Sequence, residues 1–175
     1  MLRDPALVTW IRTGDKGGRA YPDGSTAQAR FAAYLDLVHA RTNTLLGPDG
    51  RPQLPWPRAL GTTPWAVCRE LESGAAAPGA RYRSVLVRWR NPERVATLAQ
   101  RLAGHVTDQR PGALFVGNAT LPRHVALLVP GDDGSLLVHD PGSGAVAALD
   151  VPALVDRRTE VAGWTQPWFL VGPVG

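Results

Sequence analysis

GALFVGNATLPRHVALLVPGDDGSLLVHDPGSG, residues 112–144, is the stretch that decides the fold of this 175-residue chain. Its short apolar runs have the length of single strands, and turn-forming residues separate them, most clearly PGDDG at 130–134. Consecutive strands joined by such turns pair antiparallel, so the stretch predicts a β-meander. The predicted strands, the last of them just beyond the quoted stretch, are 113–118, 124–129, 135–140 and 145–150.

The residues on either side of this meander predict five helices and two further strands. Apolar residues recur at helical spacing through most of the first half. Thr63 with Pro64, and Asn91 with Pro92, have the residue types of a helix N-cap and first helical position. The order of elements predicts a single α+β domain over residues 1–175, with N-terminal helices packed on a C-terminal antiparallel sheet. The expected helices are 1–13, 26–46, 62–74, 91–104 and 151–157, and the further strands are 81–89 and 168–171.

Composition and charge limit the classes of partner. The hydrophobic fraction of 44% and charged fraction of 19% are typical of a globular domain. The formal charge of +4 comes almost entirely from arginines spread from Arg3 to Arg158 without a dense run, so we expect no nucleic-acid partner. No apolar run approaches the roughly 20 residues that cross a bilayer, so we expect no membrane partner. Asp4 and Pro5 interrupt the segment where a signal peptide would be apolar, which predicts a cytoplasmic location.

Cysteine and histidine are too few and too scattered for the common metal sites. Cys68 is the one cysteine, which excludes an internal disulfide, fits a reducing compartment and excludes zinc sites with two thiolates. The four histidines, at 39, 105, 124 and 139, do not show the spacing of metal ligands. No motif indicates a cofactor either. We therefore expect neither a metal nor a cofactor.

His124 and Asp140 form the clearest functional pattern. If residues 130–134 are a five-residue hairpin loop, Val129 faces Ser135 and His124 faces Asp140. Directly opposed residues of antiparallel strands share a face of the sheet, with Cβ atoms about 4.5–5.5 Å apart. A carboxylate in that position accepts a hydrogen bond from the imidazole and fixes its tautomer, as the orienting acid of a catalytic base does. The alternative is that Asp140 caps the following PGSG turn and His124 is an ordinary strand residue.

The same stretch resembles the second half of papain-like cysteine peptidases of the type that processes bacteriocin leaders. In those domains a His enters one strand, an apolar run and a turn follow, and the next strand ends in Asp-Pro before a Gly. Here these features are His124, VALLV and LLVHDPGSG with Asp140 and Pro141. The resemblance implies a papain-like fold with His124 as general base and Asp140 as its orienter. More widely, PWPRALGTTPW (55–65) and GWTQPWFLV (163–171) resemble segments of a group of actinobacterial proteins, which implies no activity.

The resemblance also implies a thiol nucleophile upstream, at the start of a long central helix and commonly in a Thr-Cys-Gly setting. The first predicted helix begins at Met1 without a capping signal, so we expect the turn that carries this thiol to precede Met1. Cys68 is the other candidate, because the chain order Cys, His, Asp is that of a papain-like site. With Thr63 as N-cap, however, Cys68 is the fifth helical residue, beyond the N–H groups that lower a thiol pKa. Its apolar neighbours predict a core position, so both roles stay open for Cys68.

Two hypotheses on function follow. In the first, a thiolate attacks an amide or thioester of a peptide or protein substrate, His124 transfers the proton and Asp140 holds the imidazolium. The chain is then a cysteine peptidase or acyltransferase, inactive as written if the upstream thiol is essential. In the second, a domain of the same fold keeps His124 and Asp140 but binds a peptide or partner protein without catalysis. No feature of the sequence predicts an oligomeric state.

Overall fold

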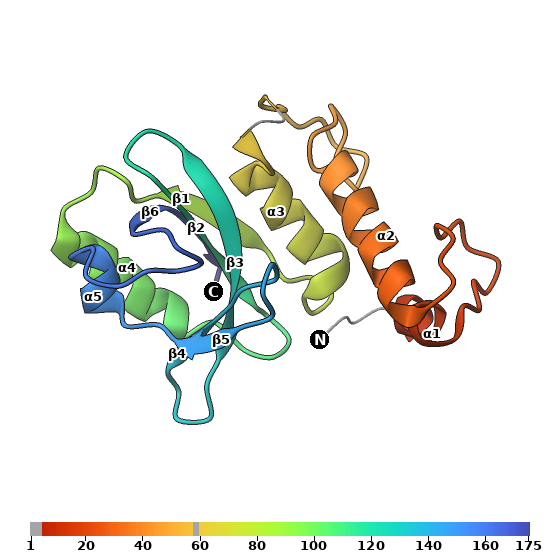
Figure 1. The fold of residues 1–175 in the computed structure, drawn as a ribbon. Coiled ribbons are helices and arrows are strands. Elements are labelled where there is room, and N and C mark those ends of the chain that lie inside the picture. The colour runs from red at the N-terminus through yellow and green to blue at the C-terminus, as the bar shows by residue number, and fades with distance from the viewer. Residues whose placement is uncertain (1–4, 58–59) are drawn as a thin grey trace.

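The computed structural model describes residues 5–57 and 60–175. Its helices and strands are arranged around one antiparallel sheet of six strands, so the α+β class that the sequence predicts is confirmed (Figure 1). The strand order is β1-β6-β2-β3-β4-β5, in which β2 to β5 form the predicted meander. The strands are β1 Tyr82–Leu86, β2 Gly112–Gly117, β3 Pro122–Pro130, β4 Leu136–His139, β5 Val146–Ala148 and β6 Gln166–Pro173.

The two helices whose caps are predicted begin at those caps, and the helices predicted at 26–46 and 151–157 end earlier than predicted. Thr63 Oγ1 accepts a hydrogen bond from the N–H of Ala66 at 3.1 Å, as an N-cap does. The second helix stops near Arg41 rather than at 46, and the side chain of Gln53 donates to the carbonyl of Arg41 at 2.9 Å. Residues 1–4 of the first predicted helix lie outside the described residues. The helices are α1 Pro5–Thr13, α2 Ala27–Arg41, α3 Pro64–Glu70, the π-helix η2 Leu71–Ala75, α4 Pro92–Ala103 and α5 Val151–Val155.

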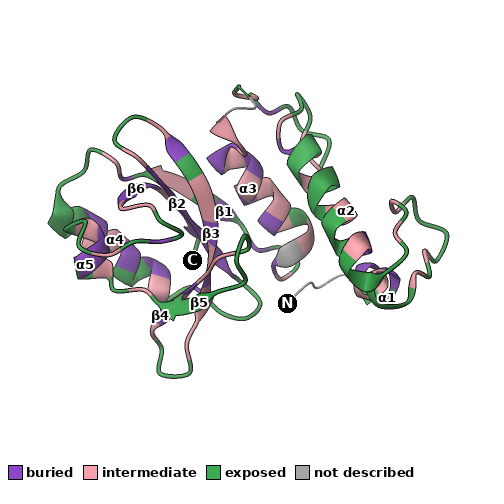
Figure 2. Ribbon diagram, in the orientation of Figure 1, coloured by how far each residue is buried: buried purple, intermediate pink, exposed green. Residues whose placement is uncertain are grey.

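Helices cover both faces of the sheet (Figure 1). On one face α3 packs against β1 and β6, and on the other α4 and α5 pack against β6. All six residues of β2 are buried, with Phe115 in the α3 core and Leu114 in the α4/α5 core. Of the N-terminal helices, α3 is the one that packs extensively on the sheet. Helices α1 and α2 pack on each other, and much of the surface of α2 stays exposed (Figure 2).

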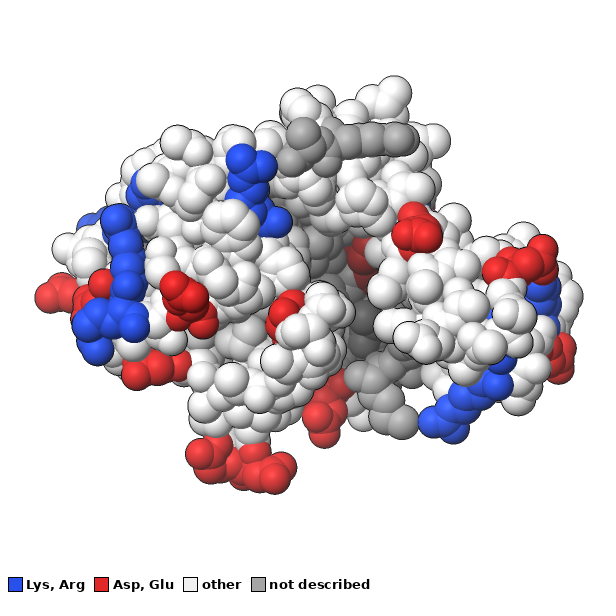
Figure 3. Space-filling model, viewed as in Figure 1, with Lys and Arg blue, Asp and Glu red and all other residues white. Residues whose placement is uncertain are grey.

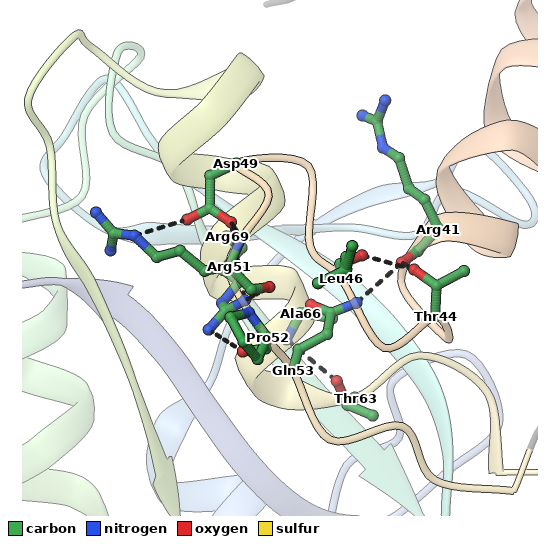
Figure 4. Close-up of polar contacts among 10 residues, drawn as sticks. All are labelled: Arg41, Thr44, Leu46, Asp49, Arg51, Pro52, Gln53, Thr63, Ala66 and Arg69. Carbon is green, nitrogen blue, oxygen red and sulfur yellow. Dashed lines mark hydrogen bonds and ion pairs between the residues drawn. The ribbon is translucent and has the colours of Figure 1, made fainter.

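Side-chain hydrogen bonds hold the connector between α2 and α3 (Figure 4). The guanidinium of Arg69 donates to the carbonyls of Arg51 and Pro52 at 2.6 and 2.7 Å. Gln53 binds the end of α2, as described above. These contacts attach the connector to both helices that it joins.

Candidate functional site

His124 lies next to an irregularity in the sheet. The register of β2 and β3 pairs His124 with Val116 and leaves Arg123 without a partner on β2. One extra residue in a strand is a β-bulge, which bends the strand and redirects its side chains. Gly117 is required beside it, since a Cβ there would lie 2.1 Å from the carbonyl oxygen of Leu121. The backbone of β2 at Gly117 therefore lies directly against the turn that leads into β3. This close approach sets the start of the part of β3 that carries His124.

The β3–β4 hairpin has a register that differs from the predicted one. Gly131 donates its backbone N–H to the carbonyl of Ser135 at 2.8 Å, so the loop begins one residue later than the predicted loop at 130–134. This moves the pairing by two residues and places His124 diagonally to Asp140 instead of directly opposite. Side chains alternate between the faces with a period of two, so this even shift keeps both residues on one face.

The side chains of His124 and Asp140 meet. Nε2 of His124 lies 2.7 Å from Oδ1 of Asp140. Both are largely shielded from water, with 25% of the His124 side chain and 15% of the Asp140 side chain exposed. Gly142 is next to the imidazole, where a Cβ would lie 3.7 Å from Cε1 of His124. The structure thus brings together the two residues that the sequence predicts to be neighbours.

Hydrogen bonds within its own turn are the main cause of a lowered pKa of Asp140. Oδ2 accepts a hydrogen bond from the hydroxyl of Ser143 at 2.6 Å, and Oδ1 accepts one from the N–H of Gly142 at 3.0 Å. These two bonds, with a smaller contribution from His124, lower the pKa of Asp140 from 3.8 to about 2. The carboxylate is therefore charged at neutral pH, and capping the turn is compatible with orienting the imidazole.

The charged carboxylate determines the tautomer of a neutral His124. A carboxylate is an acceptor only, so Nε2 carries the ring proton and donates it to Asp140. Nδ1 then keeps its lone pair, and no described residue forms a hydrogen bond with Nδ1. An imidazole held in this way can take a proton from a nucleophile through Nδ1.

Cys68 lies away from this pair. It is buried in the core between α3 and the sheet with Phe115, whereas Val116, the partner of His124, belongs to the core on the opposite face. Opposed residues share a face, so the sheet separates the thiol from the imidazole. Burial, with a smaller effect of the nearby Glu72 carboxylate, raises the pKa of Cys68 to about 12. Of the two roles that the sequence leaves open, this position matches a core residue.

An apolar groove of about 300 Å³ lies on the other face of β3, where α2 and α3 approach the sheet. It begins one residue away from the pair, because Val125 follows His124 and Pro141 follows Asp140. This groove was not predicted from the sequence. The signal that could have indicated it is the helical spacing of apolar residues in α2, such as Leu35 and Val38, which line the groove. The main apolar side chains that line it are Leu35, Val38, Val67, Leu71, Val125 and Leu127.

Figure 3 shows Lys and Arg side chains mainly toward the two ends of one face, and Asp and Glu side chains both at its edges and beside a hollow near its middle. No helix in the described part of the chain has the length and hydropathy needed to cross a bilayer. Nor do the described His, Cys, Asp and Glu side chains form a group of three or more that could hold a metal ion.

Comparison of the chain with models of protein families, with curated proteins and with solved structures finds no match. A functional interpretation therefore depends on the geometry of the His124–Asp140 pair and on the resemblance of residues 112–144.

Proposed function

We propose that this chain is a papain-like domain of the cysteine peptidase or acyltransferase type, with His124 as general base and Asp140 as its orienting acid. The observation that carries the proposal is the 2.7 Å contact between Nε2 and Oδ1, which leaves Nδ1 for proton transfer. The packing of a helix on an antiparallel sheet, with His and Asp on neighbouring strands, supports a papain-like arrangement. The proposed substrate is an amide or thioester of a peptide or protein.

In the proposed reaction, Nδ1 of His124 removes the proton of a thiol and the thiolate attacks the carbonyl carbon of the substrate. The imidazolium then donates this proton to the leaving amine or thiol as the tetrahedral intermediate collapses to a thioester. Asp140 stabilises the positive charge on the ring through Nε2. In the second half of the reaction, His124 removes a proton from water or from another nucleophile. The deprotonated nucleophile attacks the thioester, and the imidazolium returns the proton to the leaving thiolate, which restores the thiol.

This reaction needs a thiol within reach of Nδ1, and Cys68 lies behind the sheet. The first experiment is to translate the reading frame upstream of the Met1 codon. An in-frame Thr-Cys-Gly would supply the thiol, and the longer chain should then hydrolyse peptide thioesters. A stop codon before any upstream cysteine codon would remove the basis for catalysis by this chain.

The longer chain also allows a sharp test of the two site residues. His124→Ala should lower kcat/KM about 10²–10⁴-fold, the usual contribution of a general base. His139→Ala is the matched control, because His139 lies on β4 beside Asp140 but points to the opposite face, where it pairs with Leu127. Equal losses in the two variants would contradict the assignment of His124 as the base.

A second candidate function, peptide binding without cleavage, is favoured by the apolar groove next to the pair and by the buried Cys68. A pool of random decapeptides passed over the immobilised chain tests it, with retained peptides identified by mass spectrometry. Leu35→Asp should abolish retention, since Leu35 lines the groove. Leu37→Asp is the control, because Leu37 is similarly exposed on α2 (40% against 43%) but does not line the groove. This function would be excluded if the unaltered chain retained no peptide. It would also be excluded if the unaltered chain and both variants retained peptides equally.

A further inference from the structure

A second cavity, of about 160 Å³, lies far from the His124–Asp140 pair. It is bounded by the C-terminal part of α4, by β1 and by the end of β6. Pro167 of β6 is at the level of Val116, the partner of His124, and the first residue of β6 that lines the cavity is Leu170. Three residues of strand separate these levels, or roughly 10 Å, and neither His124 nor Asp140 lines the cavity. The cavity is therefore independent of the proposed catalytic site.

Three nitrogen-bearing side chains from two elements converge on this cavity. Arg83 comes from β1, Arg101 comes from α4, and His105 follows α4. None of the ion pairs or side-chain hydrogen bonds among the described residues uses any of the three. No acidic side chain of the described residues lines the cavity, although Gly175, the last residue of the sequence, does. The two guanidinium groups are thus available to an anion.

Below these side chains the cavity has an apolar floor formed by Leu98, Leu102 and Leu170. The floor is held in place by direct contact between α4 and the backbone of β6. A Cβ on Gly172 would lie 1.8 Å from Cδ1 of Leu102, so the glycine is what allows this approach. Leu102 and Leu170 are also part of the buried core, which makes the floor a rigid surface.

We propose that this cavity binds a small organic anion, with a carboxylate or phosphate group between Arg83 and Arg101 and an apolar body on the leucine floor. Guanidinium groups bind both kinds of oxyanion through paired hydrogen bonds. The cavity is close in size to the engineered cavity of about 150 Å³ that holds benzene in another protein, so the apolar body has at most about six carbon atoms. The last turn of α4 directs carbonyl groups with partial negative charge toward this end. Binding of an anion therefore depends on the two arginines.

The test uses four probes titrated into the full chain, followed by two-dimensional ¹H–¹⁵N NMR. Benzoate and phenyl phosphate carry both parts of the proposed ligand, benzyl alcohol lacks the charge and inorganic phosphate lacks the apolar body. We expect saturable shifts of the Leu102 and Gly172 amides with benzoate, phenyl phosphate or both, and dissociation constants at least tenfold larger for the other two probes. The tighter of the first two identifies the anionic group.

Variants then test the arginines. Arg83→Gln/Arg101→Gln should weaken binding of the better probe at least tenfold. The control Arg12→Gln/Arg94→Gln removes the same charge from exposed positions outside the cavity and should change binding less than twofold. All four arginines are exposed, so both variants should fold, which their melting temperatures check. The proposal is wrong if neither anionic probe gives saturable shifts, if benzyl alcohol or inorganic phosphate binds equally well, or if both double variants bind alike.

Discussion

Replacing Gly117 with alanine would test whether the close approach of β2 to the next turn holds His124 in place. A Cβ on Gly117 would lie 2.1 Å from the carbonyl oxygen of Leu121, 2.8 Å from Cα of Pro122 and 2.9 Å from N of Arg123. All three are backbone atoms of the segment that leads into His124. The contact can therefore be relieved only by moving that backbone, not by rotating a side chain.

The size of the effect follows from these distances. Ordinary contacts of a Cβ begin at 3.4 Å, so the oxygen of Leu121 must move by more than about 1 Å. Overpacking of a rigid site costs about 1–3 kcal/mol, and backbone atoms as the obstacle place Gly117→Ala near 3 kcal/mol. For a domain of this length each kcal/mol changes the melting temperature by about 2–4 °C. We therefore expect a fall of about 6–12 °C.

Two measurements on Gly117→Ala separate a local from a general effect. Calorimetry gives the melting temperature, and ¹H–¹⁵N NMR of the imidazole reports whether Nε2 of His124 still donates to Asp140. Gly74→Ala is the control, because its Cβ would meet no atom within 4 Å, and alanine in a helix is about 0.5–1 kcal/mol more favourable than glycine. An unchanged melting temperature and imidazole spectrum in Gly117→Ala would refute the reasoning. Equal destabilisation by Gly74→Ala would do so as well.

Two further predictions concern titrating groups. The folded-state pKa of Asp140 is lowered from 3.8 to about 2, so the stability that its carboxylate contributes is present above the ordinary pKa and is lost as the pH falls toward 2. Urea unfolding at about pH 5 and about pH 2.5 measures the fall in the free energy of unfolding between these two pH values. The fall should be smaller in Asp140→Asn than in the unaltered chain, and equal falls in the two proteins would contradict the prediction. Cys68 should react slowly with iodoacetamide in the folded chain, because raising its pKa from 9.0 to about 12 lowers the thiolate fraction about a thousandfold. Mass spectrometry follows the rate at which Cys68 is labelled. Labelling of the folded chain as fast as in urea would show that Cys68 is not a core residue, and so would a labelling rate that His124→Ala alters.

Asp140 shows why a catalytic role and a structural role are hard to separate in a strand-end aspartate. Its turn supplies two hydrogen bonds from Gly142 and Ser143, and His124 supplies the third. The turn keeps the carboxylate charged and fixes its direction. A histidine on the neighbouring strand therefore meets an acceptor that is already oriented. The reaction proposed above also needs an accessible thiol, and the one cysteine of the described residues, Cys68, is buried.

Local chemistry made much of this protein predictable from its sequence. Proline and capping residues mark the start of α3 and α4, and Gly-rich turns separate the strands of the meander. These signals act within a few residues, so they need no knowledge of the fold. The shared face of His124 and Asp140 was predictable for the same reason. The period of two tolerates an error of two in the register, and the predicted register was wrong by that amount.

Contacts between distant segments decided the rest. Gln53 binds the end of α2 from twelve residues away, the face on which Cys68 is buried depends on where α3 packs, and one cavity is lined by both Arg83 and Arg101. Each of these features is set by the free energy of packing one element on another. That energy depends on surfaces that the chain brings together only when it folds, and local patterns in the sequence do not record which surfaces meet.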